Sequence, residues 1–267
     1  MRPAELAEQV AALEWYHSIE LAPGVVTPGW FDCRAIAPRA LPGSCAGMRC
    51  LDVGTYDGFW AFEMERREAA EVIAIDALDE SRWDWPAVGT ELSRASAAAR
   101  KAAGSGFEVA RAALGSSVER WDASVYELDP ERHGRFDLVY LGSLLLHLRD
   151  PVRALEAVRT VTAGRLIVVD AVGATLSLAP FPLASLHAME RPVWWKPNLR
   201  GLARMVRSAG FVIESGPRLI FMPAGDGMPR APLTVKNLRH RVSREIVVAC
   251  RIGDPHALLS AVPRQDL

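Results

Sequence analysis

Two aspartates, each near the end of a short apolar run, have the residue types and spacing to bind a cofactor. Asp52 lies in the run Cys50–Val53, and a second run ends at Asp76, 24 positions after Asp52. Gly54 and Gly58 follow the first run, and a helix-compatible stretch begins at Gly58. Glycine has no Cβ, so the backbone can turn sharply and a ligand can approach it closely. The pattern predicts a buried strand, a tight turn and a helix N-terminus, the first unit of a nucleotide-binding α/β sheet.

The residues in this turn disfavour a dinucleotide cofactor. A dinucleotide site has the pattern G-x-G-x-x-G, in which a pyrophosphate contacts bare backbone amides. Here Asp52 stands at the first position and Tyr56 replaces the middle glycine, so a carboxylate and a bulky ring would face the pyrophosphate. Asp76, at the tip of the second strand, can instead accept hydrogen bonds from both hydroxyls of a ribose. The alternative is a chance strand–turn–helix with solvated acids.

The composition is that of a globular protein with no strong electrostatic preference. The chain has 267 residues and a mass of 29.2 kDa, and half of it is hydrophobic, which suffices for one large α/β domain with an added arm. The formal net charge is −1 and the pI is about 6.6, so no global field attracts nucleic acid or a membrane. No apolar run approaches the ~20 residues that span a bilayer, and the N-terminus has no signal-peptide pattern. We therefore expect a cytoplasmic protein.

The cysteines and acids give no indication of a metal site. Cys33, Cys45, Cys50 and Cys250 form no C-x-x-C pair and have no histidines at zinc spacing, and no acidic cluster has magnesium-like spacing. We expect reduced, mostly buried thiols, with a Cys45–Cys50 disulfide as the alternative.

The order of elements predicts an α/β fold, a Rossmann-like doubly wound and mostly parallel seven-stranded sheet with an antiparallel last strand and an N-terminal helical arm. Residues 1–45 would form the arm, beginning with an amphipathic helix at Pro3–Glu20, and residues 46–255 the cofactor-binding domain. Further strands are expected at Val118–Leu128, Phe136–Leu141, Arg165–Val172, Phe211–Glu214 and Glu245–Arg251. Further helices are expected within Glu91–Leu114, from Pro151 to Gly164 and at Asn198–Gly210. The tail after Gly253 is expected to be a short helix or frayed chain.

The pattern Asp-x-Gly-x-x-x-Gly at residues 52–58 resembles motif I of the class I methyltransferases that use S-adenosyl-L-methionine (SAM). The resemblance implies that the acid lies near the cationic amino-acid end of the cofactor and that the glycine loop lies against it. It also implies a loop beside the adenine and S-adenosyl-L-homocysteine as the product. It places Leu141–Ser143 against the methyl-bearing sulfonium and His147 at the entrance. The expected cofactor-binding residues are Asp52, Gly54, Thr55, Tyr56, Gly58, Asp76, Ala77, Ser124, Val125, Leu141 and Gly142.

Longer segments are similar to a subgroup of bacterial methyltransferases related to the tRNA wobble-uridine carboxymethyltransferase, which forms the 5-oxyacetic acid group. The segments are Trp15–Leu21, Gly24–Trp30, Leu51–Trp60, Phe136–Pro151, Trp194–Asn198 and Ala209–Phe211. In the tRNA enzyme, basic residues before motif I take part in pairing the extra carboxylate of a carboxylated cofactor. Here the arm has no lysine and only Arg34 and Arg39 close to the motif, so we expect plain SAM.

Acceptor binding and base catalysis are expected from aromatic residues and histidines outside motif I. Tyr16 and Trp30 would fold over the cofactor edge as a lid, and an irregular insertion at about residues 172–200 would contribute acceptor contacts from His187, Trp194 and Trp195. A base is required only for a nucleophile that starts protonated. The candidates are His147 first, then His17, then His187 with Glu190 behind it; the alternative is that each histidine is structural or exposed. Trp83 and Trp85 would stack on adenine, wall off the acceptor or anchor their own loop.

Three functions fit these features. The first is a SAM-dependent methyltransferase that modifies a small molecule in a biosynthetic or tailoring pathway. The second is a tRNA-modifying methyl- or carboxymethyltransferase acting on a wobble uridine, supported by the basic run Met228–Arg244, which a solvated hairpin or a face near the last strands explains better than phosphate binding does. The third is a non-catalytic SAM-binding regulator, which the intact acids at both strand tips disfavour.

Overall fold

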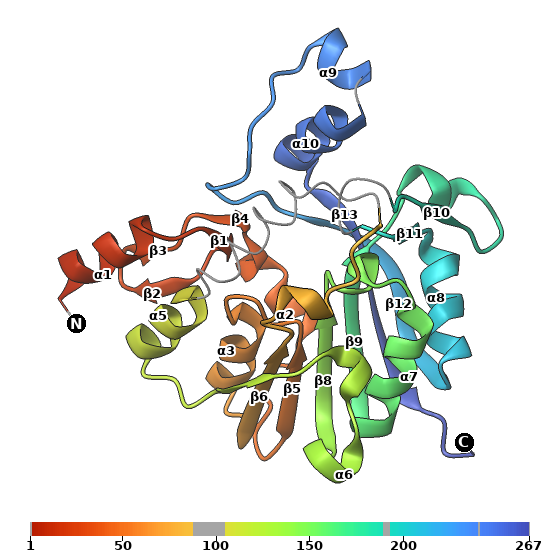
Figure 1. The fold of residues 1–267 in the computed structure, drawn as a ribbon, viewed down its shortest axis with the longest axis horizontal. Coiled ribbons are helices and arrows are strands. Elements are labelled where there is room, and N and C mark those ends of the chain that lie inside the picture. Colours follow the sequence, from red (N-terminus) through yellow and green to blue (C-terminus); the bar gives the residue numbers. More distant parts are fainter. Residues whose placement is uncertain (1, 88–104, 189–192, 240, 267) are drawn as a thin grey trace.

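A seven-stranded sheet forms the centre of the computed structural model, which describes residues 2–87, 105–188, 193–239 and 241–266 (Figure 1). The strand order is β12-β13-β9-β8-β5-β6-β7, and every pairing among β5 to β9 is parallel. β13 is antiparallel to both of its neighbours. This confirms the predicted mostly parallel sheet with an antiparallel last strand. The strands are β5 (Arg49–Val53), β6 (Glu71–Asp76), β7 (Glu119–Asp122), β8 (Phe136–Gly142), β9 (Thr162–Ala171), β12 (Phe211–Met222) and β13 (Asp254–Pro263).

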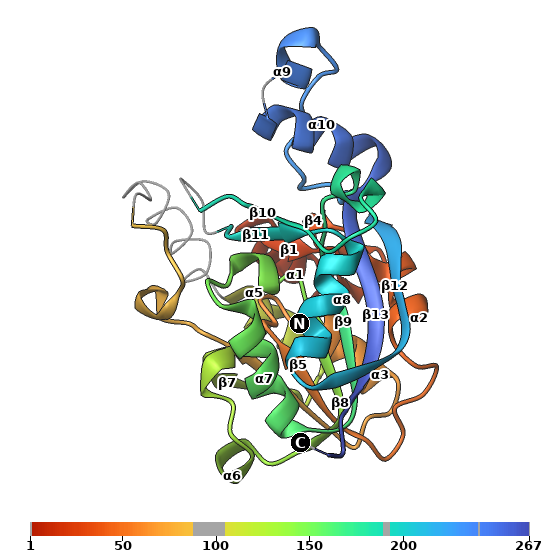
Figure 2. The ribbon, with the colours of Figure 1, turned by 90° about the vertical axis from the view of Figure 1, so that its right-hand side faces the viewer.

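Successive residues of the central strands point into two different cores. Cys50, Leu138 and Tyr140 pack with α3 (Phe59–Arg66), α5 (Ser105–Leu114) and the N-terminal arm. Their neighbours Leu51 and Val139 pack on the opposite face with α7 (Pro151–Val161) and α8 (Leu199–Ser208). Figure 2 shows helices on both sides of the sheet. A strand covered on both faces has no polar face, which explains its continuous apolar sequence.

The last strand is not where the sequence predicts it. Glu245–Arg251 lies in α10 (Arg241–Ile252), and the strand between β9 and β12 is β13, so the expectation of a short helix or frayed tail after Gly253 is wrong too. A short apolar run fits a strand and a buried helix equally well, so its pattern alone does not separate them. β13 contributes Ala257, Leu259 and Ala261 to the core, all fully buried.

The N-terminal arm contains strands as well as helices. The first helix, α1, spans only Pro3–Ala11, so the predicted continuation to Glu20 is wrong. β1 (Trp15–His17) pairs in parallel with β4 (Gly29–Phe31), and β2 (Glu20–Ala22) forms a hairpin with β3 (Val25–Val26). In β1 the outer two side chains are buried and the middle one is half-buried, a period of two that fits a strand. The arm then passes through η1 (Cys33–Ala35) and α2 (Ala37–Ala40) to β5.

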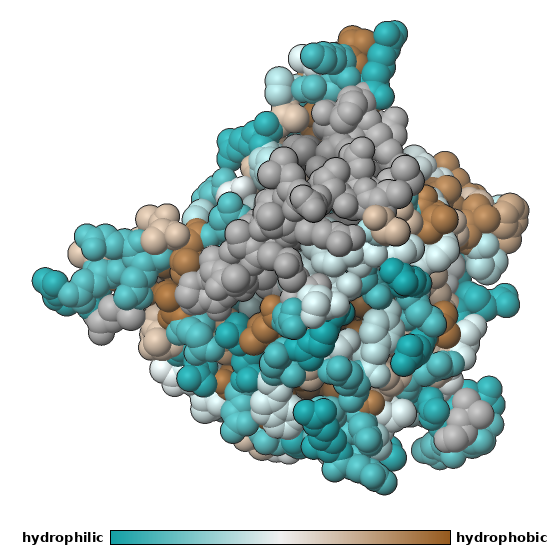
Figure 3. All heavy atoms as spheres, in the orientation of Figure 1, coloured by the Kyte–Doolittle hydropathy of each residue, from teal (hydrophilic) through white to brown (hydrophobic). Residues whose placement is uncertain are grey.

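The insertion after β9 forms a small hairpin beside the sheet. β10 (Ala184–Leu186) and β11 (Trp195–Pro197) are antiparallel, and they follow η5 (Thr175–Leu178). Asn198 joins this insertion to α8, because its side chain accepts the Gly201 N–H at 2.7 Å and donates to two carbonyls of the insertion. Figure 3 shows hydrophobic residues at this edge, where Leu178, Phe181 and Leu186 are exposed.

The remaining elements of the described chain are shorter. The helix α7 ends at Val161 and not at the predicted Gly164. α9 (Val235–Arg239) and α10 project from the body of the molecule in Figures 1 and 2. None of the helices in the described ranges is both long and apolar enough to cross a membrane. The predicted helical residues 91–104 and the candidate Glu190 lie outside the described residues. The remaining elements are η2 (Glu80–Arg82), η3 (Val125–Glu127), α6 (Pro130–His133) and η4 (Leu145–His147).

Candidate active site

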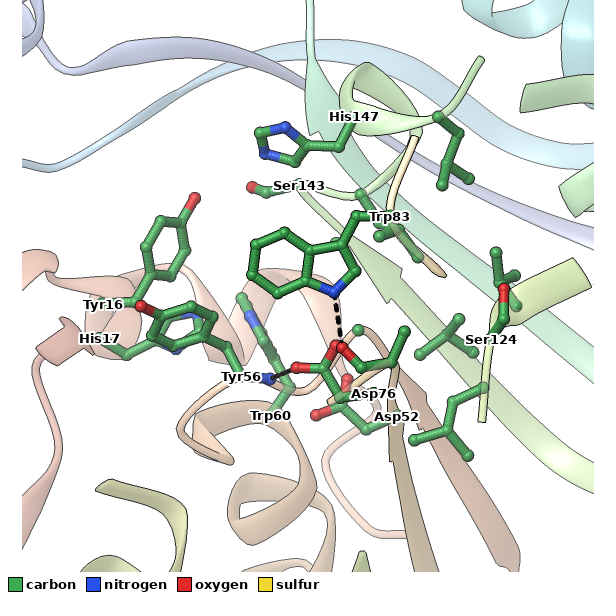
Figure 4. A pocket seen from close by; sticks show the side chains of 18 of the residues that line it. Tyr16, His17, Asp52, Tyr56, Trp60, Asp76, Trp83, Ser124, Ser143 and His147 are labelled. Carbon is green, nitrogen blue, oxygen red and sulfur yellow. Dashed lines mark hydrogen bonds between the residues drawn. The ribbon is translucent and has the colours of Figure 1, made fainter. Parts of the chain in front are cut away.

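A pocket opens at the carboxyl ends of β5, β6 and β8, where ligands bind in open parallel sheets (Figure 4). Residues from the N-terminal arm and from the loops after four strands line it together. In Figure 4, Asp52 and Asp76 lie toward one end, and Ser143 and His147 toward the other. The predicted site residues that line it are Tyr16, His17, Trp30, Asp52, Gly54, Tyr56, Asp76, Ala77, Ser124, Val125, Gly142 and His147.

Asp52 is a buried acid with an unused oxygen. Its side chain is 1% exposed, and its Oδ2 atom has no hydrogen-bond partner among the described residues. Burial raises the pKa of Asp52 to about 7, although the nearby Thr55 hydroxyl and His17 oppose the shift. A buried carboxylate oxygen without a partner is costly unless a ligand supplies one. The ammonium group of a bound SAM would be such a partner, so this part of the pocket fits the cofactor that the sequence predicts.

Asp76 is held at the tip of β6 by the glycine loop. Its Oδ2 accepts the backbone N–H of Tyr56 at 3.2 Å. Asp76 is 6% exposed. Gly54 has φ +79°, a conformation that a residue with a side chain rarely adopts, and its N–H donates to Ile75 O at 2.9 Å. The loop after β5 is thereby fixed against the end of β6. The carboxylate of Asp76 is left beside the pocket, where it can accept hydrogen bonds from ribose hydroxyls.

A second buried acid shapes the loop after β8. Asp170, at the end of β9, is 1% exposed and accepts the backbone N–H groups of Leu144 and Leu145, each at 2.8 Å. Burial raises the pKa of Asp170, and these hydrogen bonds oppose the shift. Asp170 thus holds the start of η4, the turn that brings His147 to the pocket.

The arm closes the pocket from the side of β5. Asp57 accepts the backbone N–H groups of Tyr16 and His17, each at 2.8 Å, and it also contacts the His17 ring nitrogen Nδ1. The ring of Tyr16 lies 5.4 Å from Tyr56 and 6.5 Å from Trp30, measured between centroids. The arm therefore brings aromatic side chains to the glycine loop, as the lid prediction requires.

The loop after β6 forms a further aromatic wall. Trp83 donates from Nε1 to the Ala77 carbonyl at 2.7 Å, and its ring stacks on Trp85 with centroids 5.9 Å apart. Asp84 accepts the Tyr126 hydroxyl at 2.6 Å and the Arg149 N–H at 2.7 Å. These bonds tie the wall to the loops after β7 and β8. Trp83 thus walls the pocket and anchors its own loop at the same time.

Several predicted site residues do not line the pocket and have structural contacts instead. Leu141 is fully buried in the core, and a Cβ at Gly58 would come within 2.4 Å of the Phe62 ring. Thr55 is also buried, beside Asp52. The nitrogen Nε2 of His187 lies 3.0 Å from the Ser185 hydroxyl. Trp194 and Trp195 donate from Nε1 to the carbonyls of Asp84 (2.6 Å) and Arg149 (3.0 Å), so the insertion supports the pocket wall from behind.

Two residues at or behind the pocket, Trp60 and His256, escape the sequence analysis. Trp60 lines the pocket from α3, and Ser143 from the loop after β8, next to the predicted Gly142. Ser143 Oγ lies 3.0 Å from Nε2 of His256, which is carried by β13. Ser143 belongs to the segment Leu141–Ser143, which the resemblance places against the methyl-bearing sulfonium. No local pattern marks His256, because its contact with Ser143 joins residues that are 113 positions apart.

Comparison with known proteins identifies the architecture. A family model described as a methyltransferase domain matches residues 32–215. No curated protein matches the chain. The N-terminal domain of EvdMO1, solved with S-adenosylhomocysteine (SAH) bound, has a TM-score of 0.53 and 18% identity, with 99% of this chain and 98% of that chain covered. The [4+2]-cyclase SpnF has a TM-score of 0.53 and 16% identity, with 98% and 93% covered. A Burkholderia thailandensis 1,6-didemethyltoxoflavin-N1-methyltransferase has a TM-score of 0.47 and 16% identity, with 82% and 72% covered.

At these identities the structural matches show a shared fold and nothing more specific. SpnF is described as a cyclase, so the fold alone does not specify methyl transfer. The family model is the finding that bears on activity. It matches more than half of this chain, and its range contains both acids, the glycine loop and the loop after β8.

Proposed function

This chain belongs to the family of methyltransferase domains, and on that premise we propose that it transfers a methyl group from SAM to a small-molecule acceptor. We further propose that the reaction belongs to a biosynthetic or tailoring pathway. Residues 1–45 act as the lid, the sheet binds the cofactor, and residues 172–200 stabilise the acceptor side of the pocket.

The aromatic enclosure of the pocket is the observation that carries this proposal. Tyr16 and Trp30 come from the arm, Trp60 from α3 and Trp83 from the loop after β6, and all four line the same pocket. Small-molecule sites are concave and mostly apolar, with a few polar groups that fix orientation. Here those polar groups include Asp52, Asp76, Ser143 and His147. A compact molecule with an apolar body and a polar reacting group fits such a site.

The cofactor residues divide the pocket into two ends. Asp52 would accept from the ammonium group of SAM, and Asp76 from the ribose hydroxyls, with Ser124 and Val125 beside the adenine. When bound, SAM supplies an electrophilic methyl group on a positively charged sulfur. The chain's own task is to hold the acceptor in line with that methyl group and to exclude water. Ser143 and His147 lie at the opposite end from Asp52 and Asp76, the proposed acceptor side, and His147 would contact the acceptor there.

The charges in the pocket favour plain SAM over a carboxylated cofactor. An extra carboxylate needs a fixed cation, preferably an arginine fork or a lysine. Among the described lining residues, Arg82 is the arginine, no lysine is present, and the Arg82 guanidinium is already paired with Asp122 and Glu127. Methyl transfer therefore suits this pocket better than carboxymethyl transfer.

A tRNA acceptor is the second candidate, and the projecting α9 region is the observation that favours it. Arg230, Lys236 and Arg239 are exposed on or before this helix and could contact phosphates. The near-neutral pI and the enclosed aromatic pocket favour the small molecule.

Incubation with methyl-labelled SAM and an extract of the source organism, with and without ribonuclease treatment, tests the proposal. Label in the small-molecule fraction that survives ribonuclease is the expected result. Label in RNA that is lost on treatment would establish the tRNA candidate instead. Absence of label from every fraction, with the enzyme shown to bind SAH, would contradict methyl transfer as the function.

A further inference from the structure

Ser143, His256 and Asp254 form a hydrogen-bonded series that ends in the pocket. Ser143 Oγ is 3.0 Å from His256 Nε2, and His256 Nδ1 is 3.1 Å from the Asp254 carbonyl oxygen and 3.4 Å from its carboxylate. Ser143 lines the pocket, whereas His256 is 2% exposed and does not. The three residues come from the loop after β8 and from β13, so the fold of the sheet brings them together.

The partners of His256 fix the direction of these hydrogen bonds. A carbonyl oxygen and a carboxylate only accept, so Nδ1 of His256 carries the proton. Nε2 of the neutral ring is then an acceptor, and the Ser143 hydroxyl donates to it. In this arrangement a histidine, oriented by a backbone carbonyl and with a carboxylate 3.4 Å away, can take the proton of a hydroxyl group.

The backbone of Ser143 supports a functional role. Its φ is +48°, in the left-handed region that residues other than glycine and asparagine rarely adopt. Such strain costs free energy and persists where the surrounding structure imposes it, often at active sites. The Ser143 N–H donates to Val169 O at 2.9 Å, which holds the residue in this conformation and directs its hydroxyl to His256.

Tyr16 adds a second hydroxyl beside Ser143. Burial raises the pKa of Tyr16, and its hydrogen bond with Ser143 opposes the shift. Tyr16 thus stays a neutral phenol. In Figure 4 the hydroxyl groups of Tyr16 and Ser143 lie at the same end of the pocket, near His147. Asp170, Cys33 and Asp254 are the other ionisable groups whose charges act on Tyr16, and Asp170 also interacts with His256.

We infer that Ser143 is the group that deprotonates the acceptor, that His256 and Asp254 are its positioning residues, and that the acceptor reacts through a hydroxyl group. This inference rests on the proposed function. The acceptor hydroxyl gives its proton to Ser143 Oγ while the Ser143 proton moves to His256 Nε2. At the same time an oxygen–carbon bond forms to the methyl group, the sulfur–carbon bond breaks and sulfur keeps the electron pair. The resulting imidazolium is stabilised by Asp254 and, once the methylated product has left, releases its proton through Ser143 to water.

The inference also defines the class of acceptor. A carboxylate or another anion needs no base, so a pocket that contains this series is suited to a nucleophile that starts protonated. Apolar aromatic walls from Trp30, Trp60 and Trp83 favour a ring-shaped body next to that hydroxyl. The acceptor is therefore a hydroxylated cyclic small molecule, a phenol or a ring alcohol.

Ser143→Gly and Ser215→Gly provide a matched test. Glycine suits the left-handed backbone at position 143 and removes only the hydroxyl. Ser215 is an exposed residue of β12 whose hydroxyl lies 3.0 Å from that of Ser260, outside the pocket, so its glycine variant is the control. With methyl-labelled SAM and the small-molecule fraction of the extract, we expect Ser143→Gly to lower the initial transfer rate about 100-fold or more. SAH affinity should stay within threefold, and Ser215→Gly should transfer at the wild-type rate.

Nitrogen NMR of the six histidines gives a readout that needs no acceptor. The His256 signals are assigned by their loss in His256→Gln. In wild type we expect His256 Nδ1 to be protonated and Nε2 to be unprotonated. In Ser143→Gly we expect the Nε2 signal to shift. The opposite tautomer would overturn the inference. So would an unchanged transfer rate in Ser143→Gly, or label found only in carboxylate esters. If wild type transfers no label, the proposed function fails, and the NMR result still decides whether Ser143 donates to His256.

Discussion

Asp57 joins the glycine loop to the N-terminal arm through His17. Both residues are buried, at 2% and 5% exposure, and the Asp57 carboxylate binds the His17 ring together with two backbone N–H groups of β1. The loop that carries the proposed cofactor residues therefore also positions the aromatic residues of the arm. The position of the proposed lid and the conformation of this loop are coupled through one side chain.

Replacing Asp57 by alanine should release the arm. Removal of one partner of a buried, hydrogen-bonded pair costs about 3–5 kcal/mol of folding free energy, because the remaining groups stay buried without partners. We expect hydrogen exchange in residues 15–31 to accelerate more than in β8 and β9. Glu20→Ala, an exposed acid on the same arm, is the control. Equal acceleration throughout the sheet would mean that Asp57 stabilises the fold as a whole and not the lid.

Asp52 should make SAH binding depend on pH. Its folded-state pKa of about 7 means that the apo protein holds a neutral acid at pH 6, whereas an ammonium ligand favours the carboxylate. SAH affinity should therefore rise between pH 5.5 and 7, with proton release on binding in calorimetry. In Asp52→Asn both the pH dependence and much of the affinity should be lost. A pH-independent affinity in wild type would place the ligand's amino group elsewhere.

The same pKa predicts that Asp52 costs stability in the apo protein. A folded-state pKa above the unfolded value of about 4 adds stability below pH 4, and this contribution is lost as the pH rises through 7. At pH 8, Asp52→Asn should raise the free energy of unfolding by up to about 4 kcal/mol, since one pKa unit is about 1.4 kcal/mol. Urea denaturation at pH 4 and pH 8 measures the difference. A variant that is less stable at pH 8 would show that the ionised form is well solvated.

Asp76→Ala should weaken SAH binding by about 1.5–3 kcal/mol, the range for hydrogen bonds to a charged group. Glu71→Gln, an exposed acid at the other end of β6, should leave the affinity unchanged. Calorimetric titration compares the two variants. Unchanged affinity in Asp76→Ala would remove Asp76 from the cofactor site.

His147→Ala should slow turnover without weakening cofactor binding. η4 brings His147 to the proposed acceptor side of the pocket, away from Asp52 and Asp76 (Figure 4). The expected result is slower label transfer with SAH affinity within threefold of wild type. Full activity would make His147 structural, whereas lost SAH affinity would move it to the cofactor end.

Local sequence patterns were sufficient to predict that the proposed cofactor residues lie together at one edge of the sheet. Asp52, Gly54 and Asp76 lie at the ends of apolar runs, and parallel strands bring such ends to one edge by geometry alone. The strands β5, β6 and β8 were themselves predicted from their apolar runs. Each is buried on both faces and therefore apolar throughout.

The acceptor half depended on contacts between distant residues. His256 reaches Ser143 only because β13 inserts between β9 and β12, and the sequence analysis placed the last strand at Glu245–Arg251 instead. His187, Trp194 and Trp195 had suitable residue types in an irregular segment. His187 contacts Ser185 within its own hairpin, and the two tryptophans donate to neighbouring loops. Residue type alone does not show whether an aromatic side chain lines a pocket or supports its wall.

A crystal structure with SAH bound tests most directly the claim that one pocket holds both cofactor and acceptor. The account predicts the amino group of SAH at Asp52, its ribose hydroxyls at Asp76 and its sulfur facing the end of the pocket that contains Ser143 and His147. SAH bound outside this pocket, or with its sulfur directed away from Ser143, would contradict the account.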